Sequence, residues 1–170
     1  MIMPLNIKTD NFVDFGVPII RGCNLTNGRF ISKQFVYLSD QKADELKGSN
    51  AFFDDIIFTH RGTLGQVAII PKNEFKRYVI SQSQMKMTCD LEVADPMFIF
   101  YFFKSSIGQN KLLCNTSQTG VPAIAQPLSS LRSITLMLPT LQEQKAISAV
   151  LSSLDDKIEL NQRINDNLAA

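Results

Sequence analysis

The chain has 170 residues, a net charge of +1, a hydrophobic fraction of 45% and one histidine. This composition predicts one globular domain with an appendage, and it excludes a strongly basic chain that binds nucleic acid through net charge alone. Three cysteines without CxxC spacing argue against a zinc site, so we expect no metal and a reducing, cytoplasmic location. No signal-peptide core is found near the N-terminus, and the longest apolar run, residues 97–103, is too short to span a bilayer.

The first segments of the chain combine a strand, a turn and a short helix. Residues 17–22 (VPIIRG) form an apolar run that predicts a strand. Asn27-Gly28 is a turn signal of the hairpin type. Residues 39–48 predict a short helix with Ser39 as its N-cap, since a serine hydroxyl accepts from a free amide of the first turn.

Three strands are predicted in the middle of the chain. Residues 55–60 and 66–71 are apolar runs joined by the glycine-containing segment RGTLG. Residues 78–90 alternate between apolar and polar side chains, which is typical of a half-buried strand. The first half of the domain is therefore expected to be mostly strands.

The second half of the domain opens with a helix. Asp95 as N-cap and Pro96 at the first helical position predict a single buried helix over residues 95–113. Residues 114–130 are polar, contain Gly and Pro, and predict a loop, and residues 131–139 predict a last strand. The expected fold class is α+β, a strand-rich domain of mixed or antiparallel pairing with short helices.

A long C-terminal helix of coiled-coil type is expected after Pro139. Thr140 and Glu143 form a capping box, in which each side chain satisfies the other residue's free amide. Apolar residues and two asparagines then recur at heptad spacing, which predicts a helix interface. The interface positions are Ile147, Leu151, Leu154, Ile158, Asn161, Asn165 and Leu168. The alternative is a helix folded back on its own domain, but residues 141–169 would span about 43 Å, longer than the surface available.

The sequence contains few residue patterns that are typical of a catalytic site. The segment THRGTLGQ matches neither the GxGxxG nor the GxxxxGK[ST] phosphate-binding pattern. Asp54 and Asp55 are adjacent in a predicted strand and point to opposite faces, so they are expected to be a solvated strand start rather than a metal pair. A lone His60 is more often structural than catalytic. We therefore expect no enzyme, and a small hydrolase or transferase using His60 and Asp55 stays open as the weakest alternative.

Polar segments instead carry side chains of the kinds that can bind DNA. Gln and Asn pair with adenine, Arg and Lys pair with guanine, and hydroxyls commonly hold phosphates. Between residues 59 and 87 the sequence has five Lys or Arg residues and a single acidic residue, Glu74. The alternative is that these segments are polar only because they are solvent-exposed loops. The expected DNA contacts are Arg61, Thr63, Lys72, Lys76, Arg77, Gln82, Gln84, Lys86, Thr116, Gln118 and Thr119.

The order of these segments resembles one half of the specificity (S) subunit of type I restriction–modification systems. The matching stretches are VPIIRGCNLTNGRFI, DIIFTHRGTLGQVAIIP, VISQSQMKMTCD and, most specifically, residues 116–168. In this family a target recognition domain ends at a Leu-Pro step, here Leu138-Pro139. A helix containing Glu-Gln-Lys follows, here Glu143-Gln144-Lys145. The resemblance covers the chain from about Gly16 to its end.

This resemblance implies two domains with different roles. Residues 1–138 would be the recognition domain, which reads about half of a bipartite sequence in double-stranded DNA. Residues 139–170 would pair antiparallel with a second such helix, set the spacing between half-sites and dock the modification and restriction subunits. S-adenosylmethionine, ATP and Mg would belong to those partner subunits, with no cofactor in this chain, and the S subunit itself catalyses nothing.

The sequence also departs from the family pattern. A full S subunit has two recognition domains, and the tryptophan-containing segment that usually precedes the first one has no counterpart in a chain without Trp. The chain is therefore interpreted as a half-size S protein, a truncated gene product or an expressed fragment, and the first of these would need a homodimer to rebuild a two-domain reader. A degenerate recognition domain that serves only as a helix-mediated interaction module is the alternative function.

Overall fold

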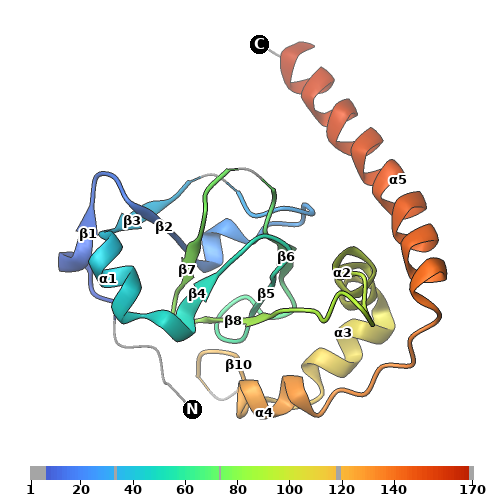
Figure 1. Cartoon of the computed structure of the whole chain (residues 1–170), viewed down its shortest axis with the longest axis horizontal. Coiled ribbons are helices and arrows are strands. Elements are labelled where there is room, and N and C mark those ends of the chain that lie inside the picture. Colours follow the sequence, from blue (N-terminus) through green and yellow to red (C-terminus); the bar gives the residue numbers. More distant parts are fainter. Residues whose placement is uncertain (1–6, 33, 73, 118–119, 169–170) are drawn as a thin grey trace.

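In a computed structural model the chain is described over residues 7–32, 34–72, 74–117 and 120–168. The elements stack in layers: a short helix, two sheets, a pair of helices, and a long helix along the outer side of that pair (Figure 1). This arrangement confirms the predicted α+β class with a long terminal helix.

The first sheet has five strands within the described residues, in the order β1-β3-β2-β7-β4. The strands are β1 (Phe12–Val13), β2 (Val17–Ile20), β3 (Val36–Leu38), β4 (Asn50–Ala51) and β7 (Tyr78–Ile80). Central β2 pairs antiparallel with β3 and parallel with β7. It is buried along its whole length, which explains why its sequence is continuously apolar rather than alternating.

The second sheet places one strand between two antiparallel neighbours, in the order β6-β5-β8. Its strands are β5 (Ile56–Thr59), β6 (Val67–Ile69) and β8 (Gln84–Met87). Ile57 lies opposite Ala68 of β6 and opposite Lys86 of β8. β5 and β6 are the two strands that the RGTLG segment was expected to join.

The alternating faces of β5 connect two parts of the core. Ile56 and Phe58 face the helices, where Phe58 packs edge-on against Phe103 with ring centroids 5.0 Å apart. Ile57 faces the first sheet and packs in a cluster with Tyr78. Successive side chains of a strand point to opposite faces, so the second sheet is a buried middle layer.

Two helices cover the outer face of the second sheet, where the sequence predicts one. They are α2 (Pro96–Lys104) and α3 (Ser106–Leu113), and Asp95 caps α2 as expected, accepting from Phe98 N at 3.0 Å. The prediction of a single helix is wrong at Ser105. Its backbone is extended (φ −71°, ψ 159°), and its hydroxyl accepts from Gly108 N at 3.2 Å to start a new helix.

The remaining short elements follow the prediction only in part. α1 (Asp40–Glu45) is capped by Ser39 as expected, through a bond from Lys42 N at 3.2 Å. Residues 114–130, predicted as a loop, include the hairpin of β9 (Thr116–Ser117) and β10 (Ala123–Ile124). The predicted strand over residues 131–139 is wrong, because α4 (Pro127–Arg132) occupies its start and an irregular segment follows.

The terminal helix α5 (Leu141–Leu168) leaves the domain and extends beyond it (Figure 1). The capping box is formed as predicted: Thr140 N donates to Glu143 Oε2 at 2.9 Å, and Glu143 N donates to Thr140 Oγ1 at 3.3 Å. Hydrogen bonds from Thr140 lower the pKa of Glu143. In the described part of the chain, no helix is long and apolar enough to cross a membrane.

Candidate nucleic-acid interface

The turn between β5 and β6, residues 60–66 and called here the reading turn, presents Arg61 and Thr63 to solvent. Two glycines make this conformation possible, because Gly62 (φ +96°) and Gly65 (φ +81°) adopt positive φ values that other residues rarely adopt. A Cβ at Gly65 would lie 2.5 Å from Gln109 Oε1. Gln109 Nε2 donates to the Gly65 carbonyl at 2.9 Å, so α3 fixes one end of the turn.

The β9–β10 hairpin lies against the reading turn. Arg61 and Ala123 form an antiparallel bridge, and Gly62 N donates to Pro122 O at 2.9 Å. Half-buried Thr116 therefore lies beside the turn, as part of the lining of a cavity of about 450 Å³. Gln118 and Thr119, two further expected contacts, lie outside the described residues.

Residues 81–84 form a second turn that joins the same end of β5. His60 N donates to Ser83 O at 2.9 Å, and His60 Nε2 lies 2.9 Å from Gln82 O. Burial lowers the pKa of His60 and the charge of Arg61 lowers it further, whereas the bond to the Gln82 carbonyl opposes them. Gln82 is exposed, so its side chain is on the surface beside the reading turn.

Gln84 differs from the other expected contacts because it is only 4% exposed. In the amide orientation that satisfies both ends, it donates to Ile20 O at 3.2 Å and accepts from Gly22 N at 3.1 Å. These bonds join β8 to the end of β2. Gln84 supports the fold beneath the turns, and we leave it out of the proposed interface.

The expected basic contacts other than Arg61 lie away from the reading turn. The antiparallel register places Lys86 near the start of β5, and Lys72 follows β6 at the same end. Lys86 Nζ lies 3.4 Å from Asp55 Oδ2, and Arg77 pairs with Asp40 and Asp44, whose hydrogen bonds raise the pKa of Arg77. Lys72 and Lys76 are exposed. The structure therefore does not gather all the expected contacts on one patch.

The candidate acid–base pair is not formed. Asp55 precedes β5 and His60 follows it, so the two side chains lie at opposite ends of the strand. The expectation that Asp55 is solvated is also wrong, because it is 2% exposed and accepts from Phe52 N at 2.9 Å, as well as from Thr88 and Lys86. Among the described residues, no group of three potential metal ligands is close enough together to hold an ion.

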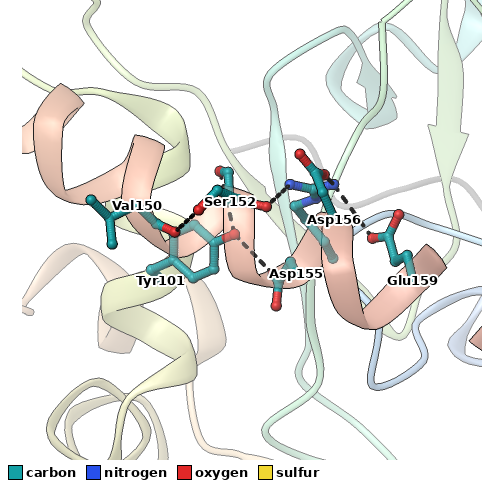
Figure 2. A network of polar contacts seen from close by, with 8 residues as sticks. Tyr101, Val150, Ser152, Asp155, Asp156 and Glu159 are labelled. Atoms are coloured by element: carbon teal, nitrogen blue, oxygen red, sulfur yellow. Dashed lines mark hydrogen bonds and ion pairs between the residues drawn. The ribbon is translucent and has the colours of Figure 1, made fainter. Parts of the chain in front are cut away.

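A polar face of α5 docks on the domain. Gln144 is fully buried and donates to Val93 O at 3.0 Å while accepting from Asp95 N at 3.0 Å. Two turns further on, Tyr101 Oη donates to Asp155 Oδ2 at 2.8 Å and lies 3.4 Å from Ser152 Oγ, as Figure 2 shows. Burial, together with the bond to Asp155, raises the pKa of Tyr101. The helix is thus held to α2 by hydrogen bonds.

Arg29 extends this docking face by one more turn. Its guanidinium donates to Ser152 O at 3.4 Å, Asp156 Oδ1 at 2.5 Å and Glu159 Oε1 at 3.5 Å. Burial by itself lowers the pKa of Arg29, but the hydrogen bond to Asp156 and the charges of both carboxylates raise it overall. Figure 2 shows Asp156 and Glu159 on consecutive turns of α5.

The apolar side chains at the predicted interface positions of α5 are called here the apolar stripe. They lie on the face of the helix next to the docking face and point away from the domain. At 100° per residue, the centre of the stripe is about 100° around the helix from the docking face. Leu154 is 50% exposed and Ile158 is 53% exposed, and Leu151 is half-buried between the two faces. Of the predicted interface positions, the exposed ones are Ile147, Leu154, Ile158, Asn161, Asn165 and Leu168. The alternative of a helix folded back on its own domain holds in part, because α5 lies against the domain from Gln144 to Glu159 through its polar face while its apolar positions stay exposed.

Several residues organise this region through contacts that were not expected from the sequence. They are Arg29, Tyr101, Gln109, Gln144, Ser152 and Asp156. Ser148, Ser152, Asp155 and Glu159 do recur at helical spacing. This signal is not distinctive, because a solvated helix face has the same pattern.

These observations define a class of protein. Its members have a β-rich domain with polar turns at one end and a long helix that extends from the domain. The sequence model of the family described as "Type I restriction modification DNA specificity domain" matches residues 7–170. The chain therefore belongs to this family, and the resemblance stated from the sequence is confirmed.

Curated relatives support this assignment. Over 98 residues, the chain is 30% identical to the type I restriction enzyme HindI specificity subunit of Haemophilus influenzae, covering 56% of this chain and 21% of that protein. Over 83 residues it is 29% identical to the MjaVIII specificity subunit of Methanocaldococcus jannaschii, covering 49% and 19%. The matched segments span about a fifth of the length of these relatives.

Solved structures share the fold. The HsdS subunit from Thermoanaerobacter tengcongensis aligns with 95% of this chain and 36% of its own length, with a TM-score of 0.61 and 16% identity. A structure describing complex assembly and conformational transition of the type I R-M system aligns with 98% of this chain and 38% of that one, with a TM-score of 0.68 and 16% identity. The same arrangement of layers and helix thus occurs in longer chains of this class.

Proposed function

We propose that this chain recognises a specific half-site in double-stranded DNA as the non-catalytic specificity component of a type I restriction–modification complex. The observation that carries the proposal is the convergence of three polar segments at one end of β5, in a chain of the DNA specificity family. Arg61 and Thr63 of the reading turn, exposed Gln82 and half-buried Thr116 are the proposed contacts to bases and nearby phosphates.

Lys72 and Lys76 are the proposed contacts to flanking phosphates. Six residues of extended chain separate Arg61 from Asp55, about 20 Å, which is the length of about six base pairs. β5 itself is buried, so the duplex would run across the surface of the domain parallel to this strand and reach the segments at both of its ends. Arg77 and Lys86 are ion-paired within the domain, so we assign them weaker phosphate contacts than the two exposed lysines.

The apolar stripe of α5 supports a role in assembly. We propose that it pairs with a second helix, either that of another copy of this chain or its counterpart in a longer S subunit, and that the same region docks the modification and restriction subunits. S-adenosylmethionine, ATP and Mg would then enter with those partners. A module that only associates through α5, without reading DNA, is the competing function that the exposed stripe also favours.

The decisive experiment is selection of duplexes from a randomised pool by the full chain together with the modification subunit and S-adenosylmethionine. Enrichment of one half-site sequence supports DNA reading, and the absence of any enriched sequence rejects it. Self-association in light scattering without DNA enrichment would favour the interaction module.

Substitutions at the two ends of β5 test the two kinds of contact. Each phosphate contact contributes about −0.9 to the slope of log K against log salt. Arg61→Ala is expected to weaken binding and to relax the base preference at one position of the half-site, by about 1–3 kcal/mol if Arg61 contacts a guanine.

Lys76→Ala is expected to weaken binding to all sequences equally and to make the salt slope shallower by about 0.9. An unchanged slope for Lys76→Ala removes it from the interface.

A further inference from the structure

The segment from Leu25 to Phe30 connects α5 to the reading turn. On one side, the Arg29 guanidinium bonds to Ser152, Asp156 and Glu159 of the helix. On the other side, the same segment is bonded to β6 and to the end of the turn. The α2–α3 pair makes a second connection, because Tyr101 bonds to Asp155 of α5 and Gln109 bonds to the Gly65 carbonyl of the turn.

The contacts to β6 are made by the backbone. Ile69 N donates to the Arg29 carbonyl at 3.1 Å, and Phe30 forms a parallel bridge with Ile69. At the other end of the strand, Gln66 Nε2 donates to the Leu25 carbonyl at 2.5 Å. Gln66 is the last residue of the reading turn, so the segment from Leu25 to Phe30 is bonded both to α5 and to the turn that carries Arg61 and Thr63.

The geometry of Arg29 restricts the direction of the helix. The guanidinium is planar and presents its donors in a fixed fork, so bonds to partners on successive turns define an orientation and not merely a distance. Arg29 is 7% exposed, and its guanidinium carbon lies 4.6 Å from the centre of the Phe30 ring. Tyr101 holds the preceding turn through Ser152 and Asp155.

We propose that Arg29 and Tyr101 form a clamp that fixes the direction of α5 relative to the reading turn, and that this clamp sets the spacing at which two recognition domains engage DNA. The inference rests on the proposed function, because a spacing matters only if the domain reads a half-site. Arg29 and Tyr101 are positioning residues in this scheme and need not touch the duplex.

A small change of direction at the clamp has a measurable effect on spacing. From Glu159 to Leu168 the helix runs about 14 Å. Rotating this part by about 15° moves its end by about 3.6 Å, close to the 3.4 Å rise of one base pair. One base pair also changes the angular position of a half-site by about 34°. Loss of the clamp should therefore broaden the preferred spacing by one base pair or more.

Arg29→Met is the test variant, and Lys157→Met is its matched control. Methionine keeps much of the aliphatic length of arginine, and the carboxylates left behind stay hydrated because Asp156 is 65% and Glu159 is 33% exposed. Lys157 is exposed on the same turn of α5, so its replacement removes the same charge without touching the clamp. Tyr101→Phe removes the other half of the clamp, because it deletes the hydroxyl that bonds to Ser152 and Asp155.

The first measurement is hydrogen exchange of the full chain without DNA. Amides of residues 152–160 should exchange about tenfold faster in Arg29→Met and, to a smaller extent, in Tyr101→Phe, and should be unchanged in Lys157→Met. Amides of β5 should keep wild-type exchange in every variant, which shows that the domain remains folded. Equal exchange in Arg29→Met and Lys157→Met overturns the clamp.

The second measurement repeats the duplex selection with a randomised spacer between half-sites. Arg29→Met should select the same bases as the wild type but accept spacers that differ by one or more base pairs, whereas Lys157→Met should keep one spacer. A single wild-type spacer for Arg29→Met overturns the proposal. If the wild-type chain enriches no sequence, the proposed function fails, and hydrogen exchange alone then decides whether the clamp exists.

Discussion

At the scale of single residues, two buried charges join segments that are distant in sequence. Asp55 accepts bonds from Phe52 N, Thr88 and Lys86, which fixes the start of β5 to the end of β8. Arg29 reaches a helix that begins more than one hundred residues later. A buried charge is stable only when it is paired and hydrogen-bonded, so each of these residues specifies one packing of its surroundings.

His60 should make the stability of the domain depend on pH. Because burial lowers its pKa below the ordinary value of 6.5, the unfolded chain binds a proton more readily than the folded one. Stability is therefore fully present above pH 6.5 and falls as the pH decreases below that value. Urea denaturation at pH 7.5 and pH 5.5 should give a larger loss for the wild type than for His60→Gln, and equal losses would contradict this assignment.

Contacts between residues close in the sequence could be predicted, whereas contacts between distant segments could not. The caps at Ser39, Asp95 and Thr140 depend on residues three positions away, so the sequence alone indicates them. In the candidate site, Arg61 and Thr63 are exposed as expected, because glycines mark their turn. The burial of Gln84 follows from contacts with β2, and no pattern within its own segment indicates this.

At the scale of elements, the break between α2 and α3 illustrates how packing overrides a continuous helical pattern. Ser105 ends one helix and caps the next, and Gly108 lets the two segments approach closely. A Cβ at Gly108 would lie 2.0 Å from the Phe102 carbonyl oxygen. The sequence predicts one helix here because neither Ser105 nor Gly108 is a strong breaker alone.

Gly108→Ala should therefore be strongly destabilising. The added methyl meets rigid backbone, so we expect the free energy of unfolding to fall by about 3 kcal/mol and Tm by roughly 9 °C. Gly28→Ala is the control, because its Cβ would meet Thr26 Oγ1 at an ordinary 3.4 Å and should cost less than about 0.5 kcal/mol. Similar melting temperatures for the two variants would show that α2 and α3 can separate freely.

At the scale of the whole molecule, α5 divides its surface between two neighbours. Its polar face is bonded to the domain through Gln144, Ser152 and Asp155, and its apolar stripe is exposed. The heptad spacing predicted the stripe, since periodicity is local to the helix. The docking of the polar face was not predictable, because it requires Tyr101 and Arg29 to be brought from other elements.

Self-association through the stripe is expected to depend on Leu154 and Ile158. Burying these half-exposed side chains contributes about 1 kcal/mol each, so replacing both with Asp should keep the chain monomeric at concentrations where the wild type associates. Replacing exposed Ala149 and Ser153 with Asp adds the same charge on another face and should leave association unchanged. Light scattering over a wide concentration range checks this, and identical masses for both variants would place the contact elsewhere.

The position of the second sheet as a buried middle layer has a consequence for synthesis of the chain. The face of β5 that carries Ile56 and Phe58 packs against Phe100 and Phe103, which are synthesised more than forty residues later. Until then Ile56 and Phe58 are exposed on a nascent chain, where apolar strands are prone to aggregate. We therefore expect release of chains truncated before α2 to yield insoluble protein, whereas chains that reach the end of α3 remain soluble.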